Sequence, residues 1–139
     1  MATVNSDTFA KVEEGKLTMG SGLMDTSVLS KCCEYEASSL AANDIINLFH
    51  MPKGAVIKEI VVDYDDLGTD TSLDVGDSND VDRYIDGADT ATAAGTARIN
   101  AIDGRNYRIG TNAGDEIITA KNLGGSATGT IKATVFYSV

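Results

Sequence analysis

The chain has 139 residues, of which 42% are hydrophobic, and a formal net charge of −10. This is enough apolar sequence for one domain with a core of its own. No apolar run approaches the roughly 18 residues of a membrane span, and the N-terminal MATVNSDTFAKVEEGK has no apolar stretch typical of secretory signals. Lys and Arg are not clustered, so we expect neither nucleic-acid binding nor attachment to an anionic membrane.

Residues 1–30 predict a polar N-terminal arm in front of the folded domain. They show neither strand-like alternation nor an extended helical stripe, apart from a short strand expected near Val28–Leu29. Arms of this kind often become ordered only against a neighbouring protein. We therefore divide the chain into an arm or lead-in at 1–30 and a β domain at 31–139.

From residue 31 onward the pattern favours strands. The segment KCCEYEASSL alternates, which places Cys33, Tyr35 and Ala37 on one face of a half-buried strand. Turn residues such as Pro52, Gly54 and the Gly-Gly pair at 124–125 separate the later segments at the spacing of a sandwich or barrel. Further strands are expected within residues 44–51, 55–67, 72–77, 91–103, 104–110, 111–122 and 129–139.

These segments predict an all-β fold, a jelly-roll-like antiparallel β-sandwich of seven or eight strands with Greek-key connections. One face of each strand should supply the core. The residues expected there are Ile46, Leu48, Ile60, Val62, Tyr64, Leu73, Val75, Ile118, Ile131, Val135 and Tyr137.

Cys32 and Cys33 are adjacent in the sequence. A disulfide between neighbours strains the peptide bond that joins them, and side chains at successive strand positions point to opposite faces. No second pair of cysteines exists to complete a zinc site. We expect two reduced cysteines in a protein made and used inside a cell.

Residues 63–89 contain ten Asp and one basic residue, Arg83. The simplest interpretation is a strand followed by a solvated, helical turn. Ser78 or Asn79 would cap the turn, Tyr84 with Ile85 would pack it onto the sandwich, and Gly87 would end it in the left-handed conformation.

Two chemical alternatives apply to the same segment. An EF-hand loop needs acids at positions 1, 3 and 5, Gly at 6 and Glu at 12, and neither the register from Asp74 nor that from Asp80 fits. An irregular calcium site remains an alternative. Catalysis by paired carboxylates needs a cleft and two acids with separated pKa values, and the sequence shows neither. Of these two alternatives, the irregular calcium site would take its ligands from Asp77, Asp80, Asp82 or Asp86.

His50 is the single histidine of the chain and ends an apolar strand before a turn. A catalytic triad centred on it would need an activated nucleophile, but no G-x-S-x-G segment accompanies it. We interpret His50 as a packed or half-exposed structural residue, with a small hydrolase as the alternative. Neither a cofactor nor a catalytic residue is predicted.

The run INLFHMPKGAVIKEIVVDYDDLGTDTSLDVGDSNDVDRYIDGADTATAAGTARI and the closing GTIKATVFYSV resemble small structural proteins of tailed phages. The shared pattern is a strand, a P-x-G-A turn, a long β-branched strand, then D-V-G-D and D-R-[YF]-[ILF]-D-G. It resembles most the capsid cement, or decoration, proteins of short-tailed phages. The resemblance covers residues 44–139 and brings no catalytic residues with it.

The resemblance implies a jelly roll on the outer surface of the phage head that clamps neighbouring major capsid subunits, assembled in the host cytoplasm. The implied partners are the major capsid protein and further copies of the chain, as a dimer or trimer. The alternative is a receptor- or carbohydrate-binding module of the head or tail surface, with Tyr84 beside Asp82 and Asp86 as its aromatic and acidic groups. The residues expected to contact a partner are Asp77, Asp80, Asp82, Tyr84 and Asp86.

Overall fold

The computed structural model describes residues 27–139, which contain strands and no helix. The all-β prediction is therefore confirmed. The predicted arm at 1–30 lies almost wholly outside the described residues, and the first strand begins at Leu29. The strands are β1 (Leu29–Leu40), β2 (Ile45–His50), β3 (Val56–Tyr64), β4 (Thr71–Gly76), β5 (Ile85–Asp89), β6 (Gly95–Arg98), β7 (Ile117–Gly124) and β8 (Ala127–Ser138).

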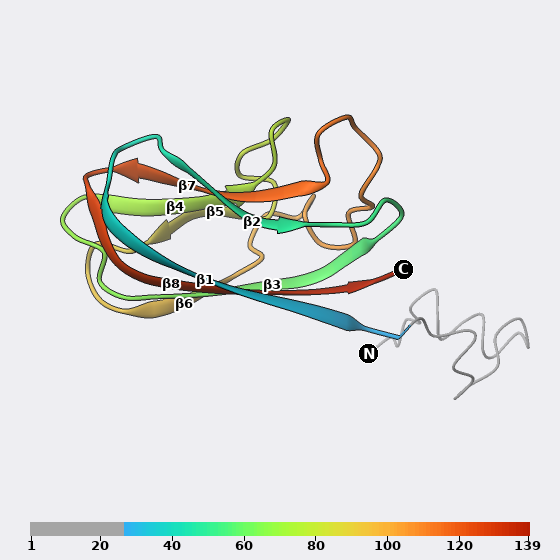
Figure 1. Ribbon diagram of the computed structural model, residues 1–139, viewed down its shortest axis with the longest axis horizontal. Coiled ribbons are helices and arrows are strands. Elements are labelled where there is room, and N and C mark those ends of the chain that lie inside the picture. The colour runs from blue at the N-terminus through green and yellow to red at the C-terminus, as the bar shows by residue number, and fades with distance from the viewer. Residues whose placement is uncertain (1–26) are drawn as a thin grey trace, which may run out of the picture.

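The strands form two four-stranded sheets that face each other, in the orders β1-β8-β3-β6 and β2-β7-β4-β5 (Figure 1). All pairings are antiparallel, and they are nested: β1 pairs with β8, β2 with β7, β3 with β6 and β4 with β5. Nested pairing of eight strands across two sheets is the strand order of a jelly roll. The predicted β-sandwich is thus confirmed.

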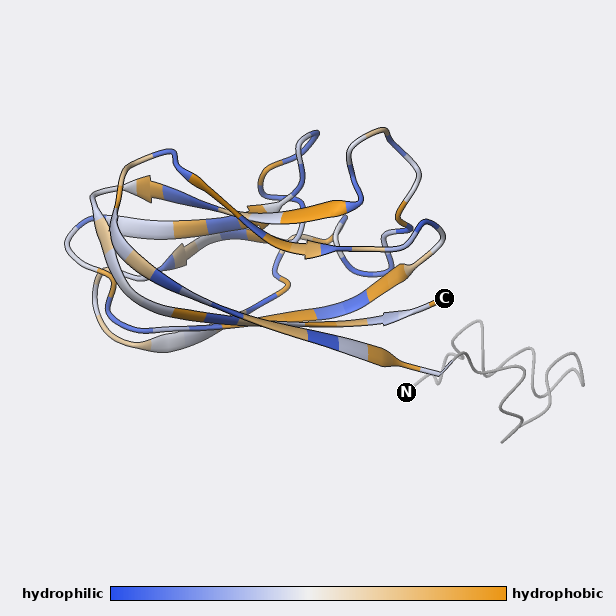
Figure 2. Cartoon of the chain, in the orientation of Figure 1, coloured by the Kyte–Doolittle hydropathy of each residue, from blue (hydrophilic) through white to orange (hydrophobic). Residues whose placement is uncertain are grey.

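The core lies between the sheets and follows the alternation along the strands, which Figure 2 displays as interleaved apolar and polar segments. In the centre, β3 and β8 bring Ile60 opposite Val135 and Val62 opposite Ala133. Every predicted core residue is buried except Tyr64, which is half-buried and packs against the core near the end of β3.

Several local predictions were wrong. The segment 104–110 forms a loop with one isolated bridge, between Arg108 and Val56, instead of a strand. The segment 91–103 keeps only the short β6. The expected helical turn at 78–87 is a turn followed by β5, which pairs with β4 and completes its sheet. Gly87 does adopt a left-handed conformation, with φ +68°, but within β5.

A hairpin turn is what the Gly124–Gly125 pair predicts, but the turn joins β7 to β8, which lie in different sheets, so it connects the sheets and closes no hairpin. Its glycines are required by a close approach of backbone. Gly124 has φ +79°, and a Cβ atom there would overlap the carbonyl oxygen of Asp70. A Cβ atom on Gly125 would likewise overlap the carbonyl oxygen of Thr69. The turn therefore packs against the β3–β4 loop without space for any side chain.

The two cysteines are free, as predicted, with Cys32 exposed and Cys33 half-buried. Burial raises the pKa of the Cys33 thiol, although the hydrogen bond with the backbone of Ala133 opposes this. Within the described part of the chain there is no helix long and apolar enough to cross a membrane.

Candidate partner-binding surface

The predicted acidic segment begins with a turn built on the Asp77 side chain. Asp77 has no exposed surface, and its Oδ1 accepts hydrogen bonds from the backbone N–H groups of Asn79 (2.9 Å) and Asp80 (3.1 Å). A third bond, from the Asp77 N–H to the Asp80 carbonyl oxygen, closes the turn. The same two bonds to Oδ1 would cap a helix, but residues 78–84 form turns and no helix follows, so the Asp77 side chain stabilises a turn. This geometry replaces the predicted Ser78 or Asn79 cap.

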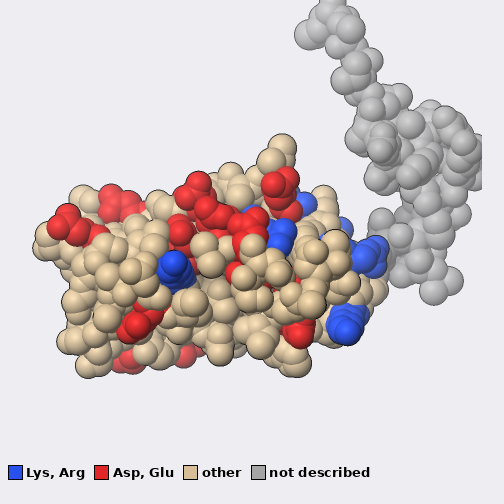
Figure 3. Space-filling model, turned by 90° about the horizontal axis from the view of Figure 1, so that it is seen from above, with Lys and Arg blue, Asp and Glu red and all other residues tan. Residues whose placement is uncertain are grey.

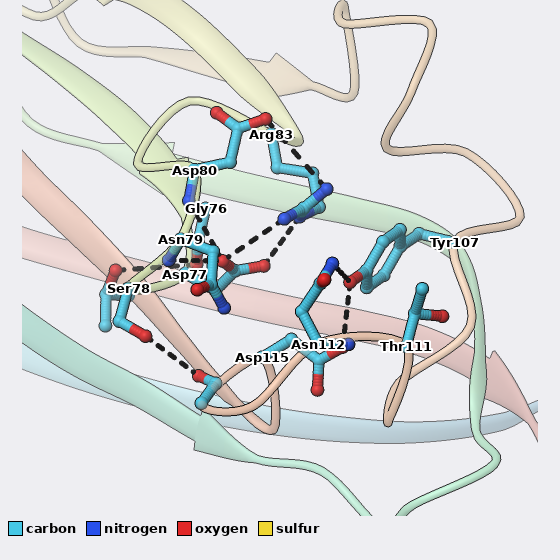
Figure 4. A network of polar contacts seen from close by, with 12 residues as sticks. Gly76, Asp77, Ser78, Asn79, Asp80, Arg83, Tyr107, Thr111, Asn112 and Asp115 are labelled. Carbon is cyan, nitrogen blue, oxygen red and sulfur yellow. Dashed lines mark hydrogen bonds and ion pairs between the residues drawn. The ribbon is translucent and has the colours of Figure 1, made fainter.

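Arg83 neutralises Asp77 within the same turn. Its Nε lies 2.6 Å from Asp77 Oδ2, and the two side chains are 10% and 0% exposed. The guanidinium also stacks 4.1 Å from the ring centre of Tyr107 (Figure 4). Burial alone would lower the pKa of Arg83, but the hydrogen bond and charge of Asp77 raise it overall, so the guanidinium stays protonated.

The loop between β6 and β7 is organised by a second buried carboxylate, Asp115. It accepts hydrogen bonds from the Tyr107 hydroxyl (2.7 Å) and from the N–H groups of Gly110 (2.9 Å) and Asn112 (2.9 Å). Burial acts to raise the pKa of Asp115, yet these donors outweigh it and lower the pKa below its usual value of 3.8. Burial, and donation of its proton to Asp115, raise the pKa of Tyr107.

Two hydrogen bonds join these loops directly. The Asn79 amide donates to the Ala113 carbonyl oxygen (2.7 Å), and the Ser78 hydroxyl donates to the Gly114 carbonyl oxygen (3.3 Å). With the Arg83–Tyr107 stack, the β4–β5 loop (77–84) and the end of the β6–β7 loop (110–116) form one fixed unit, which we call the loop wall. In Figure 1 both loops project beyond the β2-β7-β4-β5 sheet at one end of the sandwich.

An open hollow of about 390 Å³ lies between the loop wall and the outer face of β2 and β7. Ile45 and Ile117, which are 54% and 38% exposed, supply its large apolar side chains together with Val81 of the wall. We call it the outer hollow. Its remaining lining residues are Asn47, Asp77, Ser78, Gly114 and Thr119.

The surroundings of the outer hollow are acidic. Asp44 precedes Ile45, Glu116 precedes Ile117, and Asp80 and Asp82 flank Val81. Seen from the side of the β2-β7-β4-β5 sheet, acidic side chains gather near the middle of the face, while basic ones lie singly among them and toward one end (Figure 3). A hydrogen bond with Asp82 raises the pKa of Asp80, so these two carboxylates form one partly exposed acidic pair, with the Arg83 guanidinium 3.9 Å from Asp80.

The structure separates the five predicted partner-binding residues. Asp80 and Asp82 are partly exposed beside the outer hollow, and Asp86 is exposed on β5. Asp77 is buried and neutralised by Arg83, so it positions the loop wall instead of facing a partner.

Tyr84 is fully buried and packs edge-on against Tyr107, with ring centres 6.3 Å apart. Burial raises the pKa of its hydroxyl, which has no hydrogen-bond partner in the described part of the chain. Tyr84 therefore cannot serve as the exposed aromatic that the carbohydrate-binding alternative requires. The sequence placed it on the surface because three of its six nearest neighbours along the chain are charged.

The geometry also bears on the chemical alternatives. Among residues 27–139 there is no group of three or more His, Cys, Asp or Glu side chains arranged to hold a metal ion. Asp77, the most buried member of the calcium alternative, already accepts bonds from Arg83 and backbone N–H groups. His50 is exposed at the end of β2, and its carbonyl oxygen accepts a bond from Lys31 (2.8 Å).

Sequence reasoning did not identify Tyr107 or Asp115 as partners of the acidic segment. The signal available was Asn112–Gly114, read as a turn, followed at once by Asp115. An Asp after a turn that bonds back to the turn's N–H groups is a local pattern. Asp115 is linked to Arg83 through Tyr107, which accepts the stacking guanidinium and donates its hydroxyl proton to Asp115. These contacts join Arg83 and Asp115, which are far apart in the sequence, so no hydrophobic or polar periodicity could reveal them.

No protein-family model and no curated protein sequence matches the chain. Among solved structures, the chain is similar to a protein of the cyanophage Pam1 capsid asymmetric unit, with a TM-score of 0.74 and 19% identity over 100% of this chain and 99% of that chain. It is also similar to a protein of the capsid of Ralstonia phage GP4, with a TM-score of 0.63 and 26% identity over 81% of this chain and 84% of that chain. The first likeness shows a shared fold, and together they support a phage capsid-related structural protein.

Proposed function

We propose that this protein decorates the outer surface of a phage capsid and cements it by bridging adjacent major capsid subunits. The observation that carries the proposal is the likeness to a protein of the Ralstonia phage GP4 capsid, at 26% identity over 81% of the chain. The sequence resemblance of residues 44–139 to cement proteins of short-tailed phages supports the same role.

A cement protein acts by binding two adjacent capsid subunits at once. It must therefore be rigid enough to resist deformation when those subunits are pushed apart. The two sheets supply a closed core, and the buried Asp77–Arg83 pair and Asp115 fix the loops at one end. Each copy needs only a modest binding energy, because a symmetric shell sums many identical contacts. We infer that the chain acts in many copies per head, as a dimer or trimer, and that it is added in the host cytoplasm.

The N-terminal arm is the second element of the proposal. Residues 1–26 carry both charged and apolar side chains and precede β1, the edge strand of its sheet. An arm that crosses a subunit boundary and orders there would add contact area beyond the sandwich. Removing residues 2–25 should leave a folded β protein, as judged by circular dichroism, that binds capsids more weakly.

The test uses virions stripped of this protein. Heat-induced DNA release is measured for intact heads, stripped heads and stripped heads to which the purified chain has been added back. We expect stripping to lower the release temperature and adding back to restore it, with a copy number that is a fixed multiple of capsid subunits. If stripped heads stay as robust while host adsorption collapses, the receptor-binding alternative replaces the cement role.

A further inference from the structure

We propose that the outer hollow seats an extended segment of the major capsid subunit, one with aliphatic or aromatic side chains flanked by Lys or Arg. The inference rests on the proposed function and assigns it a surface. Its parts are an apolar floor, a fixed wall and an acidic perimeter.

The floor has the shape of an extended chain. In the β2–β7 ladder Ile45 lies opposite Lys121, Asn47 opposite Thr119 and His50 opposite Ile117. Ile45 and Ile117 therefore lie at the two ends of the floor, with the Asn47–Thr119 pair between them. Two exposed isoleucines separated by a polar pair fit a strand-like segment that presents apolar side chains at intervals.

The exposed apolar side chains of the outer hollow favour binding of a partner that buries them. Burying an aliphatic side chain contributes in proportion to the apolar area removed from water, and Ile45 and Ile117 retain 54% and 38% of theirs. Val81 adds a third apolar side chain from the wall. Residues that fill a shaped hollow supply most of the energy of an interface, and the surrounding contacts mainly exclude water.

The loop wall keeps this hollow open before a partner arrives. Its side chains are held by the bonds from Asn79 to Ala113 and from Ser78 to Gly114, and by the buried Asp77. Gly114 has φ +87°, and a Cβ atom there would meet Ser78 Oγ at 2.5 Å, so the two loops touch without a spacer. A preformed site avoids the entropic cost of ordering loops on binding.

The acidic residues near the outer hollow determine which residues should flank the apolar part of the bound segment. Asp80 and Asp82 flank Val81 of the wall, and Asp44 and Glu116 immediately precede Ile45 and Ile117 along the chain. Two basic side chains lie nearby: Lys121, opposite Ile45 in the ladder, and Lys53, which lines a neighbouring hollow with Gly114 and Glu116. Arg83 pairs with Asp77 at 2.6 Å and more weakly with Asp80 at 3.9 Å. The perimeter thus carries a net negative charge and favours Lys or Arg on the partner.

The same features disfavour other occupants. A second copy docked by two-fold symmetry would place this acidic perimeter against itself, and like charges in an interface are costly. A sugar ring would need an aromatic platform, and none of the residues that line the hollow is aromatic. A segment of the capsid subunit with basic flanks satisfies both the floor and the perimeter.

The test compares Ile45→Thr, Ile117→Thr and their double variant with Ile102→Thr, a matched change at an isoleucine that is 91% exposed and outside the hollow. Threonine keeps the β-branched shape of the strand residues, so the fold should survive, and thermal midpoints verify this. Binding of each full-length variant to stripped heads is measured by cosedimentation. The double variant should bind about tenfold more weakly, and Ile102→Thr should match the parent protein. Wild-type binding should weaken with added NaCl, and an Asp80→Asn, Glu116→Gln variant should show a smaller salt dependence.

The outcomes separate the two proposals. If the double variant binds heads as tightly as Ile102→Thr, the hollow is not the capsid contact, and the cement function stands. The same holds if the double variant loses only self-association, by light scattering, or only glycan binding. If the wild-type chain binds no stripped heads, both proposals are overturned.

Discussion

Replacing Asp77 with alanine tests whether the loop wall is built on a buried ion pair. The change leaves the Arg83 guanidinium, 10% exposed, without its counter-ion, and it removes the acceptor of the Asn79 and Asp80 N–H groups. Breaking a buried pair from one side costs about 3–5 kcal/mol of unfolding free energy. Since the guanidinium retains some contact with water, we expect about 3 kcal/mol, at the lower end of that range.

The assay is urea unfolding followed by circular dichroism. With a slope of about 2 kcal/mol per molar, the midpoint should fall by about 1.5 M. The matched control is Asp103→Ala, an exposed aspartate of another loop, which should stay within about 0.5 kcal/mol. Adding Arg83→Met to Asp77→Ala should recover part of the loss, because the orphaned charge is gone. A cost below about 1 kcal/mol for Asp77→Ala would refute the reasoning, since a buried ionised pair cannot lose one partner so cheaply.

Three further measurements check other parts of the structure. Val62→Ala, at a position that is 1% exposed in the central strand β3, should cost about 2 kcal/mol in chemical denaturation, and a cost below about 0.5 kcal/mol would contradict its place in the core. The pKa of Asp115 is lowered in the folded state, so its contribution to stability is complete above its usual value of 3.8 and is lost as the pH falls through the lower folded value. Asp115→Asn should therefore flatten the loss of stability as the pH falls below 3.8, as measured by urea unfolding at a series of pH values. Thermal midpoints in EDTA and in millimolar calcium should agree within a few degrees, whereas a gain of about 2–3 kcal/mol with calcium would restore the metal-site alternative for the acidic segment.

The sandwich could be predicted because burial acts on every second residue of a strand. The last strand shows this most clearly: Ile131, Ala133, Val135 and Tyr137 alternate with polar or larger outward residues, and all four are buried. Alternation also marked β3 correctly. Where strands carry a clear inside and outside, a one-residue slip would expose the core, so the pattern defines the register.

The site could be predicted only in part, because its contacts are not periodic. Asp77 accepts hydrogen bonds from local N–H groups and from Arg83, and nothing in the sequence distinguishes it from the partly exposed Asp80 and Asp82. Tyr84 is buried because the loop at 99–105 covers it: the N–H groups of Asn100 and Ala101 bond to its carbonyl oxygen. The outer hollow depends on the distance between two loops, which only the folded chain defines.

The strand order also determines when the protein can fold as it is made. The last two strands to leave the ribosome, β7 and β8, are the ones that join the others: β8 lies between β1 and β3, and β7 lies between β2 and β4. Until they emerge, β1 and β2 have no partner in their own sheets. Pairing across such long sequence separations is slow, in the range of milliseconds to seconds, and completes only with the full chain. A chain that ends before residue 117 lacks both β7 and β8 and keeps only the β3–β6 and β4–β5 pairs, so it should show little β structure by circular dichroism. Such prematurely terminated copies would not enter assembly.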